Sequence, residues 1–205
     1  MWEGYLTAID EFIAEHDEVT AAPVIDRFHV AQQYRDDFDD LRKQELKRLK
    51  QKLPQETYDQ DCKGTLWMLR KNHADLDKDE QRQLRRLLSH STLLHQAYTF
   101  REELTAIFNC ELVLADAEKR LRSWIRKVEA AKLDTFDGFI QTLNRHWQPI
   151  LNYFLQRVTS GFVEGINNKI KTIKRRCYGI RKPTTLFQRI WLDLFGRQRF
   201  LLSTT

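Results

Sequence analysis

The chain has 205 residues, of which 31% are charged, with seven glycines, four prolines and a formal net charge of +5. That length allows one large domain or two small ones with a sizeable core, and the scarcity of turn residues favours long helices. No apolar run approaches the ~20 residues that span a bilayer, and the first residues do not form a signal peptide, so no membrane role is expected.

The first 70 residues predict two helices around one short strand. Residues 2–16 have the pattern of an amphipathic helix, with Tyr5, Ile9, Phe12 and Ile13 on one side. Residues 21–26 give the one convincing strand signal, and residues 28–52 predict a long helix that turns Phe38, Leu41, Leu46 and Leu49 inward. A loop is expected over 54–64, and 65–69 is ambiguous between strand and helix.

The lone strand is a difficulty, because one strand cannot make a sheet. Val24 and Ile25 therefore either form an extended segment packed on helices or pair with strands on residues outside this sequence. Both interpretations stay open.

The pattern then becomes continuously helical, over 77–89, 91–108, 115–131 and 134–156. Asp77, Ser91 and Asp134 stand where an N-cap belongs. The apolar residues at helical spacing are expected to form the core; they are Leu84, Leu87, Leu88, Leu94, Tyr98, Phe100, Leu121, Trp124, Val128, Phe136, Phe139, Ile140, Leu143 and Trp147. A last amphipathic helix is predicted over 183–195, with Leu186, Phe187, Ile190, Trp191 and Leu194 buried.

The segment 159–179 carries the most distinctive charge pattern. One acid, Glu164, opens a helix whose other charges are all positive, and no further acid occurs before Asp193. The cations of this region are Lys169, Lys171, Lys174, Arg175, Arg176, Arg181, Lys182 and Arg189. Helical periodicity puts an apolar stripe (Val163, Ile166, Ile170, Ile173, Cys177) opposite a polar face (Glu164, Asn168, Lys171, Arg175).

Two interpretations fit that helix. A carboxylate in line with cations suits a metal ion held beside a phosphate backbone, which makes DNA or RNA the expected partner ahead of a membrane surface. The alternative is a basic, solvated surface helix with an acid at its N-terminus.

Other candidates have simpler structural explanations. The acidic quartet Asp36, Asp37, Asp39 and Asp40 could bind a metal, but a solvated acidic face is favoured. Three of the five tryptophans, Trp67, Trp124 and Trp147, could stack on unpaired bases, but core positions are favoured. We expect His73, His90, His95 and His146 to be structural or exposed, and Cys62, Cys110 and Cys177 to be reduced core thiols of a cytoplasmic protein.

Two segments resemble the catalytic domain of insertion-sequence transposases of the ISL-three family, which belong to the DDE group and have an RNase H-like fold. Residues 24–30, Val-Ile-Asp-Arg-Phe-His-Val, are similar to the family's strand-ending aspartate followed by Arg-Phe-His. Residues 159–179 are similar to its Thr-Asn-Gly-x-x-Glu-Gly-x-Asn-x-x-Ile-Lys…Arg-x-x-Tyr-Gly signature, with Ser160 and Ile180 as mild departures. Intervening segments follow the family in the same order, so the resemblance covers nearly the whole chain.

The resemblance implies a site and a chemistry. Asp26 would be the second and Glu164 the third carboxylate of a metal-binding triad for Mg²⁺ or Mn²⁺, whose two ions sit about 4 Å apart and take hard oxygen ligands. Arg27 could orient that site or contact DNA, or it could form only a surface ion pair. His29 could likewise orient the site or contact DNA, or it could only pack where the helix begins. The DNA-binding set is then Arg27, His29, Asn168, Lys169, Lys171, Lys174, Arg175, Arg176, Arg181 and Lys182.

The family's first aspartate has no counterpart in this sequence, so the chain alone is expected to perform no strand transfer. The predicted architecture is mainly α, a C-terminal fragment of an RNase H-like transposase domain with at most one or two short strands. Its parts would be 1–60 (partial RNase H-like core), 61–157 (helical insertion) and 158–205 (the catalytic-glutamate helix and basic terminal helices).

The predicted function is DNA transposition at transposon ends, in the bacterial cytoplasm near the nucleoid, with a second copy or a full-length transposase as a possible protein partner. The alternatives are a non-catalytic DNA-binding or interaction module, and a helical protein unrelated to mobile elements that binds RNA or a partner helix. Steeply salt-dependent DNA binding would separate the nucleic-acid interpretations from a partner-helix module.

Overall fold

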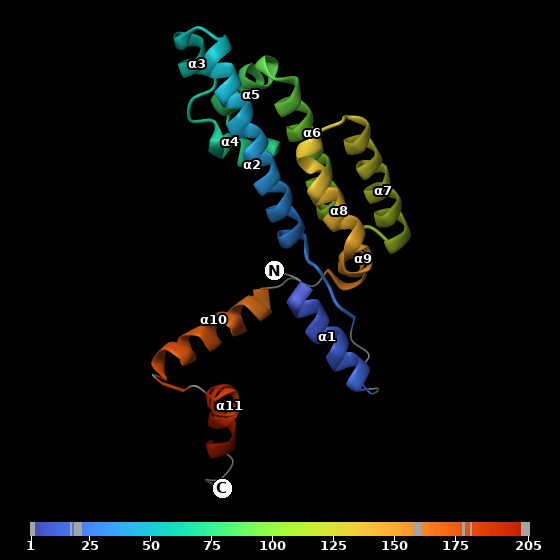
Figure 1. Ribbon diagram of the computed structural model, residues 1–205, viewed down its shortest axis with the longest axis vertical. Coiled ribbons are helices and arrows are strands. Elements are labelled where there is room, and N and C mark those ends of the chain that lie inside the picture. The colour runs from blue at the N-terminus through green and yellow to red at the C-terminus, as the bar shows by residue number, and fades with distance from the viewer. Residues whose placement is uncertain are drawn as a thin grey trace. The chain divides into compact units, whose positions relative to one another are not determined.

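The computed structural model describes residues 3–16, 18, 22–157, 161–177, 179–180 and 182–201, which fall into two compact units, residues 1–158 and 159–205 (Figure 1). In these ranges the regular elements are all helices, which confirms the mainly α prediction. An RNase H-like sheet is not seen in them, and the predicted part boundary at residue 60 stays a prediction.

The first unit contains nine α-helices and two 3₁₀ helices within its described residues. They are α1 (Glu3–Glu15), α2 (Arg27–Lys52), α3 (Gln55–Asp61), α4 (Leu66–Arg70), η1 (His73–Asp75), α5 (Lys78–His90), α6 (Thr92–Asn109), α7 (Leu114–Ala130), η2 (Asp134–Phe136), α8 (Asp137–Arg145) and α9 (Trp147–Gln156). The long α2 packs against α6, η2 and α8, and α7 packs against α6 and α9 (Figure 1).

An aromatic cluster around Tyr34 joins α2 to the rest of this unit. Its ring stacks on Phe136, with centroids 4.6 Å apart, and meets Phe139 and Trp124 edge-on at 5.4 and 5.9 Å. The Tyr34 hydroxyl donates to the carbonyl of Ala97 on α6 at 2.7 Å. Burial raises the pKa of Tyr34 well above its usual value, so it stays a neutral donor. The cluster contains core residues that the helical spacing predicts.

Two of the three predicted N-caps are confirmed. The Asp77 carboxylate accepts from the backbone of Asp79 and Glu80 at 2.8 Å, and the Glu80 side chain completes a capping box. Ser91 accepts from the backbone of Leu94 at 3.2 Å and donates its hydroxyl to Glu45 at 2.5 Å. Asp134 instead begins the 3₁₀ helix η2 and makes no side-chain cap.

The helix predicted over 134–156 is broken into η2, α8 and α9. The break falls before Trp147 because Pro149 has no N–H to donate and its ring would clash with the carbonyl of Arg145 in a continuous helix. In the first turn of α9 the missing donor costs nothing. The loop predicted over 54–64 was also wrong, since α3 starts directly after Pro54, whose carbonyl accepts from Tyr58 at 2.9 Å.

The segment expected to be a strand is extended but pairs with no strand among the described residues. It is fastened to α9 instead. The backbone N–H of Ile25 donates to the carbonyl of Pro149 at 2.9 Å, and the Asn152 amide donates to the carbonyl of Pro23 at 2.9 Å. Ile25 is buried in the core, so the first of the two interpretations, an extended segment packed on helices, describes this region.

The second unit consists of α10 (Gly161–Arg176) and α11 (Pro183–Leu201), which pack against each other. Gly179 follows α10 with a φ of +88°, a conformation that suits glycine just after a helix. In α11 Ile190 is buried, whereas Phe187 and Trp191, both expected inside, are 69% and 44% exposed. Two helices alone cannot cover every apolar side chain of that face.

Two other inward predictions were wrong in the first unit. Trp67 is 67% exposed and Cys110 is also exposed, although both were expected in the core. Periodicity identifies an apolar side of a helix but cannot tell whether another element lies against it. The remaining predicted core residues of α5 to α9 are buried or partly buried.

The acidic quartet of α2 is less solvated than expected. Asp39 is buried and forms ion pairs with Arg70 and Arg42. Asp37 is partly buried, and its Oδ2 has no hydrogen-bond partner. Burial first, and then the neighbouring carboxylates of Asp36 and Asp40, raise the pKa of Asp37 from 3.8 to about 6.

This shift predicts a pH-dependent gain in stability for Asp37→Asn. A carboxyl with a raised folded-state pKa stabilises the fold below about pH 4 and loses that contribution as the pH rises through 6. Above pH 6 the variant should therefore unfold with a free energy higher by on the order of 1 kcal/mol, a value reduced for partial exposure. Urea titrations at pH 8 and pH 4 measure the difference.

Asp10→Asn, at an exposed position of α1, is the control for the Asp-to-Asn change itself. Equal stability of Asp37→Asn and the native chain at pH 8 would contradict the prediction.

Candidate nucleic-acid interface

Asp26 lies at the N-terminus of α2 and is 3% exposed. Its Oδ1 accepts from the backbone N–H of His29 at 3.1 Å, which makes it the N-cap of the longest helix in the first unit. The hydrogen bonds of Pro23 and Ile25 to α9 hold the preceding backbone in place. The carboxylate is thus rigidly positioned, as a metal ligand must be, and it already has a structural role.

Arg27 and His29, the members of the predicted set that follow Asp26 in α2, have different surroundings. Arg27 is exposed and donates from Nη1 to the side-chain oxygen of Asn109 on α6 at 2.8 Å. The His29 ring is partly buried and meets Phe28 edge-on, with centroids 5.8 Å apart. Arg27 makes no ion pair in the described part of the chain, so the surface ion pair is not observed there.

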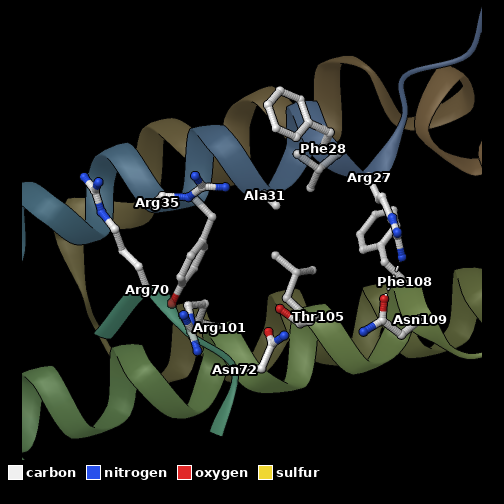
Figure 2. Close-up of a pocket in the computed structure, with 13 residues that line it drawn as sticks. Arg27, Phe28, Ala31, Arg35, Arg70, Asn72, Arg101, Thr105, Phe108 and Asn109 are labelled. Atoms are coloured by element: carbon white, nitrogen blue, oxygen red, sulfur yellow. Dashed lines mark hydrogen bonds between the residues drawn. The ribbon is translucent and has the colours of Figure 1, made fainter. Parts of the chain in front are cut away.

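A pocket of about 400 Å³ opens between α2 and α6, directly beside Arg27 (Figure 2). Its lining comes from α2, α4, α6 and the residue before η1: Arg27, Phe28, Val30, Ala31, Tyr34, Arg35, Arg70, Asn72, Arg101, Leu104, Thr105, Phe108 and Asn109. Figure 2 shows Arg27 and Asn109 together at one end of this pocket, Arg70 and Arg101 towards the other, and Asn72 beside Thr105. We call it the α2–α6 pocket.

The α2–α6 pocket is strongly basic. Four arginines and no acidic residue line it. Arg70 is paired with Asp39, and Arg101 is held by Glu102, by the carbonyl of Leu69 at 2.8 Å and by the ring of Tyr98 beneath it.

The other two arginines are not neutralised. Within the described ranges Arg27 and Arg35 have no carboxylate partner, and the side chain of Arg35 makes no hydrogen bond. Their charge is therefore available to an anion. Sequence inspection identified Arg27 alone, because the other lining arginines come from elements far apart in the chain and share no spacing.

The second unit presents the predicted charged face on α10. Glu164, Asn168, Lys171 and Arg175 are all exposed, while Ile173 is 3% exposed and Ile166 and Ile170 are partly buried. Lys174, Arg176 and Lys182 are exposed as well. The face and the opposing stripe therefore agree with the periodicity; the side chain of Val163 lies outside the described residues.

Two members of the predicted DNA-binding set need separate mention. Lys169 is exposed but forms an ion pair with Asp193 on α11 at 3.4 Å, so part of its charge is neutralised within the unit. The sequence places Asp193 far from Lys169, and only the packing of α11 on α10 brings them together. Arg181 lies outside the described residues.

The two predicted metal ligands are in different units, Asp26 in the first and Glu164 in the second. Their convergence stays a prediction. Among the described residues no three His, Cys, Asp or Glu side chains are grouped so that they could hold a metal ion, which gives the acidic quartet no support as a metal site. Asp26 and Glu164 are suitable types of ligand, because carboxylate oxygens are the ligands that Mg²⁺ and Mn²⁺ prefer.

Comparison with known proteins identifies the family. A family model described as a transposase, that of the DDE transposases of the ISL-three family, matches residues 1–190. The chain therefore belongs to this transposase family. No solved structure gives a significant match.

Two curated relatives are similar over most of the chain. The transposase for insertion sequence element IS1001 from Bordetella parapertussis is 31% identical over 177 residues, which are 86% of this chain and 43% of that protein. The transposase for element IS1557 from Mycobacterium tuberculosis is 25% identical over 136 residues, or 66% of this chain and 30% of that protein. The chain thus spans less than half the length of these relatives.

No helix within the described ranges is long and apolar enough to cross a bilayer.

The two roles of Asp26 can be separated by paired substitutions. Asp26→Ala removes the N-cap and should lower the free energy of unfolding by about 1 kcal/mol, whereas Asp26→Ser keeps an oxygen for the His29 N–H and should recover most of it. Thermal unfolding measures both. Neither variant keeps the carboxylate, so both should lose Mn²⁺ binding if Asp26 is a ligand.

Native-like Mn²⁺ affinity in Asp26→Ser would restrict Asp26 to its capping role. An Asp26→Ala chain as stable as the native one would show instead that the N-cap contributes nothing.

Proposed function

We propose that this chain forms part of a DDE transposase that acts on DNA at transposon ends, with phosphodiester hydrolysis and strand transfer as its chemistry. The observation that carries the proposal is the exposed face of α10, on which one carboxylate is followed by cations only, in a chain of the ISL-three family. DNA is the proposed partner, and a second copy or a longer transposase chain is the proposed protein partner. The bacterial cytoplasm, near the nucleoid, is the proposed location.

The charge on α10 supports DNA as the substrate. Lys171, Lys174 and Arg175 are exposed and project from one helix with Arg176. Cations fixed along a helix contact successive phosphates and release counterions on binding, which favours DNA without regard to sequence. Asn168 and Lys182 extend the same polar surface, and Asn168 could serve a phosphate or a base edge.

Asp26 and Glu164 support the proposed metal-dependent chemistry. In this proposal Asp26 and Glu164 hold a divalent cation, Mg²⁺ or Mn²⁺, through carboxylate oxygens. Such an ion activates water or a 3′-hydroxyl and stabilises the leaving oxygen. Asp26 contributes a carboxylate fixed by α2 and α9, while Glu164 contributes one that α10 presents to solvent beside the DNA-binding cations.

Two of the three carboxylates of the family pattern are found in the 205-residue sequence. We therefore expect this polypeptide by itself to bind metal weakly and to perform no strand transfer. A non-catalytic DNA-binding module derived from a transposase is the second candidate, and the N-cap role of Asp26 favours it, because a cap explains the buried carboxylate without a metal.

The DNA-binding face predicts a salt-dependent loss of affinity. Lys171→Gln with Arg175→Gln removes two exposed cations, so affinity for a blunt duplex should fall, and the log–log slope of affinity against salt should become shallower by about 2. Fluorescence anisotropy between 50 and 300 mM salt provides the measurement.

The matched control is Arg85→Gln with Arg126→Gln, which removes two exposed arginines from α5 and α7 of the first unit. An equal change of slope in both double variants would mean that net charge, rather than the α10 face, governs binding, and the proposed interface would be wrong.

A further inference from the structure

We propose that the α2–α6 pocket receives one unpaired nucleotide of the DNA strand, with its phosphate on the arginines and its base against Phe28. The proposal rests on the proposed function, because it takes DNA as the substrate. It assigns a role to Phe28, which stands in the Arg-Phe-His segment without a predicted role of its own, and to Arg35, which belongs to neither motif.

The size and wall chemistry of the pocket fit a nucleotide. Its volume of about 400 Å³ is at the lower end of the ~300–1,000 Å³ typical of ligand pockets. Val30, Leu104 and Phe108 supply an apolar wall, while Asn72 and Thr105 supply donors and acceptors. A base is a flat apolar body with a polar edge and needs both kinds of surface.

The charge of the pocket fits a phosphate. Arg35 is partly buried and its side chain has neither an ion pair nor a hydrogen bond within the described ranges, and Arg27 contacts only the neutral side chain of Asn109. Arg101, whose buried Nε has no hydrogen-bond partner, adds to the positive potential. Arginines left without carboxylates beside a pocket bind phosphate oxygens through paired N–H donors.

The aromatic residue points to an unpaired base. Phe28 is 50% exposed beside the pocket, although α2 buries its neighbour Val30 completely. An exposed aromatic ring next to cations is the usual arrangement for stacking single-stranded bases. A paired duplex presents a convex backbone that would reach the rim of a concave pocket but leave its apolar wall empty.

The position of the pocket connects it with the proposed chemistry. Arg27 lines it and follows Asp26 directly in the chain, and Phe28 lies between Arg27 and His29. A nucleotide held there would be fixed against the first turn of α2, whose N-cap is Asp26.

The test compares oligonucleotides that differ in one unpaired nucleotide. A blunt duplex and the same duplex with a single extra 2-aminopurine nucleotide are titrated with the native chain, Phe28→Ala, Arg35→Gln and the control Arg126→Gln. We expect the native chain to bind the duplex with the extra nucleotide about tenfold more tightly, with a change in 2-aminopurine emission as the base stacks. Phe28→Ala and Arg35→Gln should abolish both effects without changing affinity for the blunt duplex.

Several results would overturn the proposal: no preference for the unpaired nucleotide, an unchanged preference in Phe28→Ala and Arg35→Gln, or an equal loss in Arg126→Gln. Deoxyadenosine monophosphate that competes as well as the oligonucleotide would make the pocket a site for free nucleotides instead. Phe28 is half-exposed and Arg35 has no partner, so both variants should fold, which thermal unfolding verifies. Loss of blunt-duplex binding in the α10 variants is measured separately. Failure of the pocket proposal can therefore be distinguished from failure of the proposed function.

Discussion

The attachment of residues 22–26 to α9 is the constraint on which the candidate site of the first unit depends. Two hydrogen bonds, from Ile25 N–H to Pro149 and from the Asn152 side chain to Pro23, fix an extended backbone that makes no sheet. That backbone delivers Asp26 to the start of α2, where it caps the helix. Because α2 then packs along α6, the same attachment sets the mouth of the α2–α6 pocket.

Charge is distributed differently in the two units. In the first, the fully buried acids are matched by cations or hydrogen bonds: Asp39 has Arg70, and Glu45 accepts from Arg48 and from Ser91. The partly buried Asp37 is the exception, since its Oδ2 has no hydrogen-bond partner. The hydrogen bonds of Arg48 lower the pKa of Glu45 despite its burial, so this acid remains ionised at neutral pH. In the second unit the cations of α10 mostly face solvent, with Lys169 paired to Asp193. Within the described ranges, the α10 face and the α2–α6 pocket thus both carry cations without a carboxylate partner.

Much of the helical framework could be predicted from the sequence, because helix starts are local chemistry. Asp77 and Ser91 each cap the helix that follows them, and the leucines of α5 and α6 repeat with the period of a buried face. The break at Pro149 could have been predicted by the same local reasoning. The exposure of Trp67 could not, since it depends on which elements pack nearby, and the sequence pattern does not contain that information.

The candidate site also has a part that local sequence predicted and a part that it did not. Asp26 and the charged face of α10 were found from motifs, and their burial and exposure agree with a fixed acid and a solvent-facing basic helix. The α2–α6 pocket was missed because Arg35, Arg70 and Arg101 come from three different helices. Ion pairs such as Lys169 with Asp193 were missed for the same reason. Tertiary contacts decide which cations are neutralised and which remain available to a phosphate.

We propose that the acids at 26 and 164 share a metal ion on DNA, and a cleavage experiment tests this proposal directly. Fe²⁺ in place of Mg²⁺, with ascorbate and hydrogen peroxide, generates radicals that cut the polypeptide beside the bound ion. On the DNA-bound chain we expect cuts next to both Asp26 and Glu164, and the loss of both sets of cuts in Glu164→Gln. Cleavage near only one of the two acids, or an unchanged pattern in that variant, would contradict a shared metal site.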